Sequence, residues 1–480
     1  MKQERKGKKR NAASKALKSK PSGSEHRRAT GSMAIGRINE RLPNELLAYI
    51  FATAIVDLLP IEHRFFLALV CSVCGHWRDV AIEASELWTT IYIHNPQHIP
   101  PAELFLERSK VRLLDVDIQV TFDHGDWFRS PLAFSRVAEL TSVHLWHTRT
   151  LSLRVSDVQG AEEFSALYRP LSAPHLVSLS IYIEEGSRSA PLLLDSICSF
   201  RSSGSEGSPS NTTPISSLTR LELTSLQPEH EDMRHIFTCS PSLEILILPR
   251  FGRSWLGSQR EKIPIITTPN SLRSLAVHID YTHEIESSLA AGSSDNCCVL
   301  ASLRFPNLKY LEVLGDHSSC NLNLCGHFKD LPKLKTLRLQ QCSVSPADAQ
   351  FFRSLKLLNR LELVDNLEDV KWFKRRGRRR RVSFPFPRLS SILISEETRG
   401  SYNMSQWVCL ARIAVNNYGC TRFSIEVTTP LYGSMSQFFD PREERIRVEV
   451  NDHSPGLLHL PTEKFSDSEE EVEEYEDDFY

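Results

Sequence analysis

Two nine-residue stretches decide the fold: LKTLRLQQC at residues 334–342 and LNRLELVDN at residues 358–366. Each has leucine at its first, fourth and sixth positions and ends on cysteine or asparagine. The first six positions recur ten times along the chain, with isoleucine or valine allowed at the later ones. The copies begin at Leu113, Leu140, Leu176, Leu218, Leu243, Leu272, Leu308, Leu334, Leu358 and Leu389. The chain after about residue 100 is therefore built from repeats.

The intervals between the copies and the prolines before them indicate how one repeat is built. Six of the nine intervals measure 24 to 31 residues, and the longer ones imply insertions such as the serine-rich stretch 202–217. Segments 231–238, 347–358 and 406–415 carry apolar residues at helical spacing. A proline stops any preceding helix just before six of the copies, at Pro174, Pro241, Pro269, Pro306, Pro332 and Pro387. Each repeat is expected to be a strand plus a helix.

This pattern resembles the leucine-rich repeat, which has a period of 20–29 residues and asparagine or cysteine at its ninth position. One such unit cannot bury its own apolar face, so neighbouring units stack with their leucines inward. The resemblance implies a solenoid of parallel strands and helices with an open face suited to binding. The alternative is that the pattern marks buried strands of another α/β fold, since those are also rich in leucine, valine and isoleucine.

The segment before the repeats has a helical pattern from about Ile38 to Ile93. Four blocks occur there in order: LPNELLAYIF at 42–51, DLL at 57–59, VCGHWRDVA at 73–81 and ELW at 86–88. Together they resemble the F-box, a small helical domain. Two features depart from the family's pattern. Pro60–Arg64 lengthens the link between the first and second helices, and Ser85 stands where a proline is common.

The combined resemblance, to F-box proteins with C-terminal leucine-rich repeats of the fungal type, implies a function. In that family the F-box binds the Skp-type adaptor, and through it the cullin, of an SCF-type ubiquitin ligase, while the repeats hold the protein to be ubiquitinated. Carried over, the adaptor-binding residues are Leu42, Pro43, Leu46, Ile50 and Phe51, and the helices are held together by Trp77, Leu87 and Trp88. The alternative is that these residues only build a helical core.

The composition is ordinary for a soluble globular chain of 480 residues, with 41% hydrophobic and 24% charged residues. A formal net charge of −2 gives no overall attraction to nucleic acid or membrane. The longest apolar run, Leu46–Val56, is too short to cross a membrane. No secretory signal is recognisable, so the eleven cysteines are expected to be free thiols and the location to be the nucleus and/or the cytoplasm.

The two ends of the chain carry opposite charges. Residues 1–32 hold eleven lysines and arginines against two glutamates, and residues 466–480 hold nine acidic residues and no basic one. Both ends lack apolar periodicity and are expected to be disordered. The basic end contains the cluster KGKKR at 6–10, which fits a nuclear-import signal.

A third charged cluster lies between two repeats. It consists of Lys374, Arg375, Arg376, Arg378, Arg379, Arg380 and Arg381. Self-repulsion is expected to keep this basic loop extended and solvated. It suits a nuclear-import signal, a clamp for acidic protein, a phosphate-contacting patch or a partner for the acidic tail. The alternative function is therefore a nuclear repeat scaffold or a nucleic-acid-associated protein, although nucleic acid is disfavoured because no known nucleic-acid module accompanies the loop.

Residues with catalytic or metal-binding chemistry are few. Cys71, Cys74 and His76 have no second ligand pair at zinc-finger spacing, and helical periodicity places both thiols in the core. His230 and His235 are one residue too far apart for a zincin motif. Nucleophile-elbow, P-loop and dinucleotide-binding patterns are missing from the sequence. We expect no catalytic residue, metal or cofactor.

The expected fold class is a small all-helical domain followed by a mixed α/β solenoid. Its parts are a disordered basic arm at 1–37, the F-box at 38–93, the repeats at 100–430 and a C-terminal segment at 431–480 with an acidic tail. The expected function is substrate recognition for a ubiquitin ligase, by proximity and without reactive groups.

Overall fold

In the computed structural model the chain forms two compact units, Met1–Leu87 and Trp88–Tyr480. The described residues are 42–56, 58–120, 131–156, 164, 167–168, 172–183, 216–224, 228, 230–251, 264–279, 299–315, 321–322, 324–328, 330–344, 348–364, 375–376, 382–383, 386, 388–395, 411–412, 415, 422–429, 431–432, 445–451 and 456–457. The basic arm, most of the basic loop and the acidic tail lie outside them.

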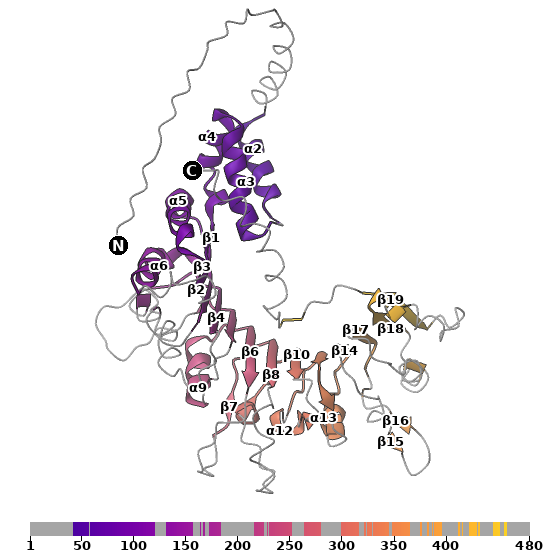
Figure 1. Ribbon diagram of the computed structural model, residues 1–480. Coiled ribbons are helices and arrows are strands. Elements are labelled where there is room, and N and C mark those ends of the chain that lie inside the picture. The colour runs from indigo at the N-terminus through magenta and orange to yellow at the C-terminus, as the bar shows by residue number, and fades with distance from the viewer. Residues whose placement is uncertain are drawn as a thin grey trace, which may run out of the picture. The chain divides into compact units, whose positions relative to one another are not determined.

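Three helices make up the described part of the first unit: α2 (Asn44–Ala54), α3 (Pro60–Val73) and α4 (Gly75–Glu83) (Figure 1). Pro60 is the first residue of α3, where its missing N–H costs no helical hydrogen bond. The backbone N–H of Leu59 donates to the Glu62 carboxylate at 2.8 Å, which caps this helix start. The expected long link at Pro60–Arg64 is therefore wrong, because these residues form the first turn of α3.

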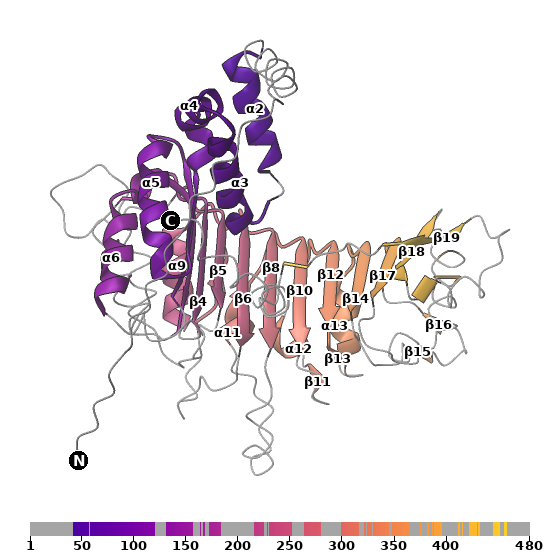
Figure 2. The same ribbon diagram turned by 45° about the horizontal axis from the view of Figure 1, so that its top comes forward.

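The second unit is dominated by one sheet of 13 strands (Figure 2). All neighbouring strands are parallel and follow one another in chain order, so each turn of the chain adds one strand at the same edge. The strands are β1 (Thr90–Ile93), β2 (Leu114–Val120), β3 (Thr148–Val155), β4 (Ser178–Ile183), β5 (Arg220–Thr224), β6 (Ile245–Phe251), β8 (Ser274–Ile279), β10 (Tyr310–Gly315), β12 (Thr336–Gln340), β14 (Arg360–Val364), β17 (Ser391–Ser395), β18 (Phe423–Val427) and β19 (Ile446–Val450). The expected mixed architecture with parallel strands is confirmed.

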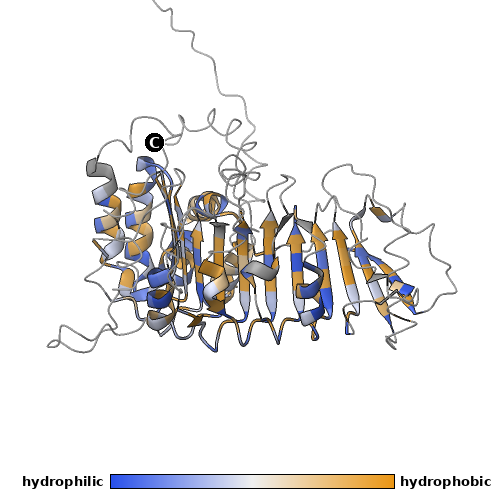
Figure 3. Ribbon diagram, turned by 90° about the horizontal axis from the view of Figure 1, so that it is seen from below, coloured by the Kyte–Doolittle hydropathy of each residue, from blue (hydrophilic) through white to orange (hydrophobic). Residues whose placement is uncertain are grey.

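Helices connect many of these strands, and α9, α12 and α13 lie on one side of the sheet in Figure 1. Figure 3 shows the molecule from below, with helices in front of the strands. They are α5 (Ile99–Ser109), α6 (Pro131–Ser142), α9 (His230–Cys239), α11 (Val299–Ser302), α12 (Leu324–His327) and α13 (Ala349–Ser354), beside the 3-10 turns η1 (Ser85–Trp88), η2 (Pro96–His98) and η4 (Leu145–His147). Small pairs add β7 (Ile266–Thr267) with β9 (Leu303–Arg304), β11 (Asn321–Leu322) with β13 (Ser343–Val344), and β15 (Arg375–Arg376) with β16 (Val382–Ser383). Two of the three helices predicted between repeats are thus present as α9 and a shortened α13, and most of 406–415 lies outside the described residues.

The register aligns the leucines of successive repeats. One leucine position of each strand lies directly beside the same position of the next strand, as Leu337 lies beside Leu361. The full row is Ile91, Val116, Leu151, Leu179, Leu221, Leu246, Leu275, Leu311, Leu337, Leu361, Ile392, Ile425 and Val448. All but Val448 are buried. At about 25 cal/mol per Å² of apolar area, a continuous row of this kind is the main source of stability in a stacked sheet.

The prolines before the repeats start tight turns. In Ala173–Leu176, Ser240–Leu243 and Leu331–Leu334 the leucine N–H donates to the carbonyl three residues earlier, at 3.3, 3.2 and 3.3 Å. Proline is the second residue of each turn, where its fixed φ suits the common β-turns. The turn then delivers the chain into the strand, so the proline sets where each strand begins.

One of the ten repeat copies is wrong. Leu140 lies in α6, and the strand of that repeat is β3, eight residues further on. From Leu151 to Val155, buried and half-buried residues alternate along β3, with Leu151, Leu153 and Val155 buried. Alternation therefore marks the strand better than the leucine pattern does at this point.

The limits of the sheet also differ from those expected. Residues Thr90–Ile93, assigned to the helical domain, form β1 and belong to the second unit. At the other end, β18 and β19 continue the sheet to Val450, beyond the expected 430. Their short alternating runs, FSIEV and IRVEV, lack the leading leucine of the other copies, which is why the leucine pattern missed them.

Candidate functional site

Helices α2 and α3 of the first unit each have one buried and one exposed apolar stripe. On α2, Leu47 and Phe51 are buried at 2% exposure, and the Phe51 ring packs on Trp77 with the centroids 5.1 Å apart. On α3, Leu67 and Val70 are buried. These residues, four and three apart in sequence, lie on one side of their helices and form the helical core.

The exposed stripe of α2 consists of Leu46, Tyr49 and Ile50, which are 52, 70 and 49% exposed. Further large apolar side chains are exposed on α3 and before it: Val56, Leu59, Phe65, Leu69 and Val73. We call these eight residues the exposed apolar set. Single exposed hydrophobic residues are normal, but this many on and between two helices of one small unit make it a candidate interaction surface.

The residues predicted to bind the adaptor do not share one environment. Pro43, Leu46 and Ile50 are exposed and Leu42 is half-buried, so all four are accessible. Phe51 differs, because it is buried against Trp77 in the helical core. Sequence patterning grouped it with the exposed residues because buried and exposed apolar stripes look alike before the helix is built.

The residues predicted to hold the helices together are well packed. Leu87 is fully buried, and its carbonyl oxygen lies 3.0 Å from His63 Nε2. Since a carbonyl can only accept, His63 Nε2 carries the proton in this contact. Burial lowers the pKa of His63 below its usual 6.5, with the Leu87 hydrogen bond opposing the shift. Trp88 packs edge-on against Phe105 at 4.9 Å, with the Arg108 guanidinium 4.4 Å from its ring, so these contacts lie within the second unit.

The second candidate surface is the face of the sheet opposite the leucines, here called the open face. Its central positions in β2, β3, β4 and β5 are Asp117, Ser152, Ser180 and Glu222, all half-buried. Arg149 and Asp115 form a two-pronged ion pair there, at 3.1 and 2.5 Å, with side chains 50 and 29% exposed. This end of the open face therefore presents hydrated polar groups to solvent.

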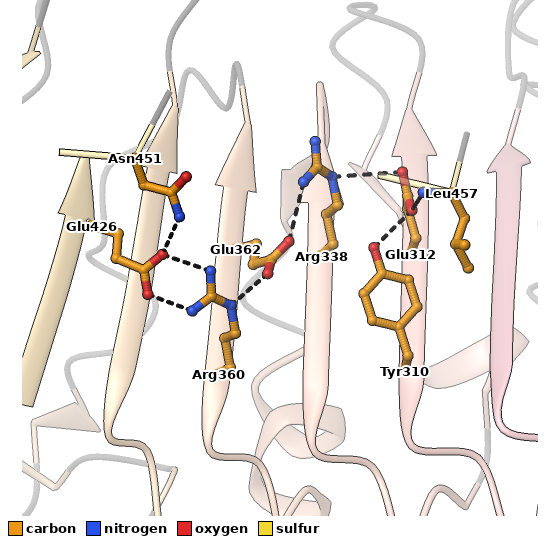
Figure 4. A network of polar contacts seen from close by, with 8 residues as sticks. All are labelled: Tyr310, Glu312, Arg338, Arg360, Glu362, Glu426, Asn451 and Leu457. Carbon is orange, nitrogen blue, oxygen red and sulfur yellow. Dashed lines mark hydrogen bonds and ion pairs between the residues drawn. The ribbon is translucent and has the colours of Figure 1, made fainter. Parts of the chain in front are cut away.

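Further along, the open face carries a buried row of charges, which we call the charged row: Glu312, Arg338, Glu362, Arg360 and Glu426 (Figure 4). Arg338 lies between Glu312 and Glu362, with nitrogen to oxygen distances of 3.6 and 3.1 Å. Glu312 is fully buried, and Arg338 and Glu362 are 6 and 5% exposed. Unpaired charges at such depth are very costly, so each member depends on its neighbour.

Arg360 joins the second half of the charged row. It donates to Glu362 at 2.6 Å and with two nitrogens to Glu426, one of them at 2.7 Å. Asn451, directly after β19, also donates to Glu426, at 2.6 Å. The hydrogen bonds from Arg360 lower the pKa of Glu426, and Glu426 raises that of Arg360. Both groups are therefore charged at neutral pH.

The first half of the charged row ends at Glu312. The Tyr310 hydroxyl donates to Glu312 Oε2 at 2.8 Å, and the backbone N–H of Leu457 donates to the same oxygen at 2.6 Å. Burial and the Glu312 charge raise the pKa of Tyr310 above its usual 10, so it stays a donor. The charged row was not predicted from the sequence, although the sequence holds Glu, Arg, Glu and Glu at the middle of LEV, LRL, LEL and IEV.

The other candidates from the sequence have structural explanations. Cys74 lies between α3 and α4, and its sulfur accepts the Trp77 N–H at 3.4 Å, so it caps α4. The Cys342 thiol is buried and donates to the Val313 and Gln340 carbonyls. His230 and His235 both lie on α9, and a His230 ring nitrogen contacts the Pro264 carbonyl at 2.7 Å. Among the described residues, no group of three or more His, Cys, Asp and Glu is placed to hold a metal ion.

The basic loop is described only in part. Arg375 and Arg376 form β15, which pairs antiparallel with β16, so the loop begins as a short hairpin. Lys374 and Arg378–Arg381 lie outside the described residues. Within the described part of the chain, the search for a helix long and apolar enough to span a bilayer gave none.

The first of these candidate surfaces lies within a stretch of the chain that matches a known protein family. Residues 39–94 match the family model described as F-box-like. These residues include α2, α3, α4, η1 and β1, and thus the whole exposed apolar set. No curated protein matches the chain. The match indicates a substrate-adaptor role in ubiquitin ligases of the SCF type, a role in which such domains are generally non-catalytic.

Proposed function

We propose that this protein is the substrate-recognition subunit of an SCF-type ubiquitin ligase. The observation that supports this most is that the F-box-like residues 39–94 carry a set of large apolar side chains left exposed on two helices. Burying those side chains in an adaptor interface would gain roughly 25 cal/mol per Å² of apolar area. The proposed partner is a Skp-type adaptor and, through it, a cullin.

We choose the proposed adaptor contacts by the exposure of their side chains. Leu46 and Ile50 on α2, together with Pro43 and Leu42 just before it, are the proposed contact residues. Tyr49 lies on the same stripe and joins them. Phe51 acts indirectly, since it holds α2 on Trp77.

The second unit is proposed to be a leucine-rich-repeat solenoid that holds the target protein. Parallel strands in chain order, an aligned leucine row and a turn before many of the strands support this assignment. The target is proposed to bind the open face, and the chain supplies no reactive groups, so it acts by raising the local concentration of the target. The basic clusters of the sequence support a nuclear and/or cytoplasmic location.

The experiment that tests this function is co-purification of the full chain with a recombinant Skp-type adaptor. The double variant Leu46→Ala/Ile50→Ala is compared with Val111→Ala/Val143→Ala, which truncates two residues of the second unit that are 74 and 64% exposed. We expect a complex with the parent chain and the Val111/Val143 variant, and loss of at least about 30-fold in affinity for the Leu46/Ile50 variant. Equal binding by both variants, with circular dichroism showing intact folds, would contradict the proposed contact residues.

A further inference from the structure

Two residues of the charged row are buried more deeply than their place on the open face would suggest. The open face of β2 to β5 is half-exposed at its central positions, yet Glu312 in β10 is fully buried and Arg338 in β12 is 6% exposed. A sheet face without helices should be wet, so another part of the chain covers these two residues. That part is the C-terminal segment at Gly456 and Leu457. Figure 4 shows Leu457 beside Glu312.

The contact is made by backbone. Leu457 donates its N–H to Glu312 Oε2 at 2.6 Å, although 145 residues separate the two in sequence. At Gly456 a Cβ atom would lie 2.2 Å from Glu312 Oε1 and 2.9 Å from Arg338 Nε, both closer than real Cβ atoms approach. Any other residue at this position would have to push aside two side chains that are buried and paired with each other, so glycine suits this close approach.

The segment is tethered next to its site. Asn451 follows β19 and donates to Glu426 at the other end of the charged row. Four residues, 452–455, connect Asn451 to Gly456. A short connection of this kind gives an effective concentration on the order of millimolar, far above that of a free protein in a cell.

We propose that Gly456 and Leu457 are a resident occupant of the open face at Glu312 and Arg338, which a target must displace. The site then fits a segment with glycine directly before the residue whose N–H reaches Glu312. The proposal rests on the proposed function in one respect, since it takes the molecule that displaces the segment to be a target protein. The docking of the chain's own segment is independent of any ligase.

The test uses the full chain and a synthetic fluorescent peptide with the sequence of residues 450–463. The variant Gly456→Val places a branched side chain against Glu312. Its matched control is Gly75→Val, since a Cβ at Gly75 meets nothing within 4 Å. Leu457→Pro removes the N–H that Leu457 donates and leaves Glu312 and Arg338 unchanged. This second variant still tests the contact if Gly456→Val does not fold.

The first readout is hydrogen exchange of the peptides that cover residues 310–315 and 456–457. We expect at least 10-fold faster exchange there in Gly456→Val and Leu457→Pro, and no change in Gly75→Val. Unchanged exchange in both variants of the segment would overturn the proposal, because the segment would then not be held by this contact.

The second readout is binding of the fluorescent peptide. We expect Gly456→Val to bind it at least 10-fold more tightly than the parent chain, whose site is already filled. A peptide with alanine in place of glycine should not bind. Equal binding to both chains would contradict occupancy, and binding to neither would show that the site does not select a free segment of this chemistry. Adaptor binding, measured separately, decides the proposed function.

Discussion

The two units depart from the usual distribution of side chains in opposite ways. The first leaves large apolar residues exposed, with Tyr49 70% and Leu69 63% accessible, while the second buries a row of charges that includes the fully buried Glu312. Both arrangements cost free energy in the isolated chain unless they are compensated. In the second unit the compensation lies within the chain, as ion pairs and the C-terminal segment. In the first, we propose that it comes from a partner.

The largest expected effect concerns the charged row. Arg338→Met should lower the free energy of unfolding of the second unit by about 3–5 kcal/mol, because it leaves the carboxylate of Glu312 buried without a cation and leaves Glu362 with Arg360 alone. Urea denaturation followed by circular dichroism measures this. The control is Arg234→Met on α9, whose ion pair with Glu231 has both side chains 66% exposed and is worth at most about 1 kcal/mol. Equal effects of the two variants would refute the importance of burial.

The next prediction separates two neighbours on α2. Phe51→Ala should lower the stability of the first unit by about 3 kcal/mol, since it leaves a cavity beside Trp77. Ile50→Ala, at a position 49% exposed, should change stability by no more than about 0.5 kcal/mol and weaken adaptor binding instead. Thermal unfolding and adaptor titration of both variants test this. A large loss of stability in Ile50→Ala would show that this stripe is core.

Acid should affect the histidines of both units before it affects the charged row. Burial lowers the pKa of His63, and it lowers that of His147 to about 4, so each favours folding above pH 6.5. Their contribution falls as the pH drops below 6.5, for His147 down to about pH 4, because the unfolded chain binds the proton more readily. Unfolding at pH 7.5 and 5.5 measures this, with His63→Gln expected to reduce the difference.

The smallest expected effect is that of Glu426 at mild acidity. Arg360 holds its pKa below the usual 4.5, so its contribution is complete above pH 4.5 and is lost only as the pH falls below that value. Between pH 7.5 and 5.5, Glu426→Gln and the parent chain should therefore show the same pH dependence of unfolding. A difference in that range would show that the carboxylate is protonated more easily than its contacts indicate.

Much of the fold could be predicted from the sequence because period and turn chemistry are local properties. Nine of the ten leucine copies lead into strands, and prolines such as Pro241 mark their turns. The strand predicted at Leu140 was wrong because the apolar spacing there also suits a helix, and these residues form α6. Strands β18 and β19 lack the leading leucine, so only their pairing with the sheet reveals them.

The candidate sites were less predictable because they depend on which side chains end up on which surface. Ile50 and Phe51 are adjacent and equally apolar, yet one is exposed and the other is 2% exposed. The contact of Leu457 with Glu312 joins residues 145 positions apart, and no local pattern encodes it. Exposure and long-range contact therefore had to come from the structure.

Calorimetric titration of the full chain with a purified Skp-type adaptor at several temperatures tests whether the exposed apolar set is an interface. We expect a one-to-one complex with a negative heat-capacity change, because the exposed apolar residues of α2 and α3 leave water on binding. Absence of a complex, with the chain shown to be folded, would contradict this expectation and would leave the F-box-like unit without the proposed partner.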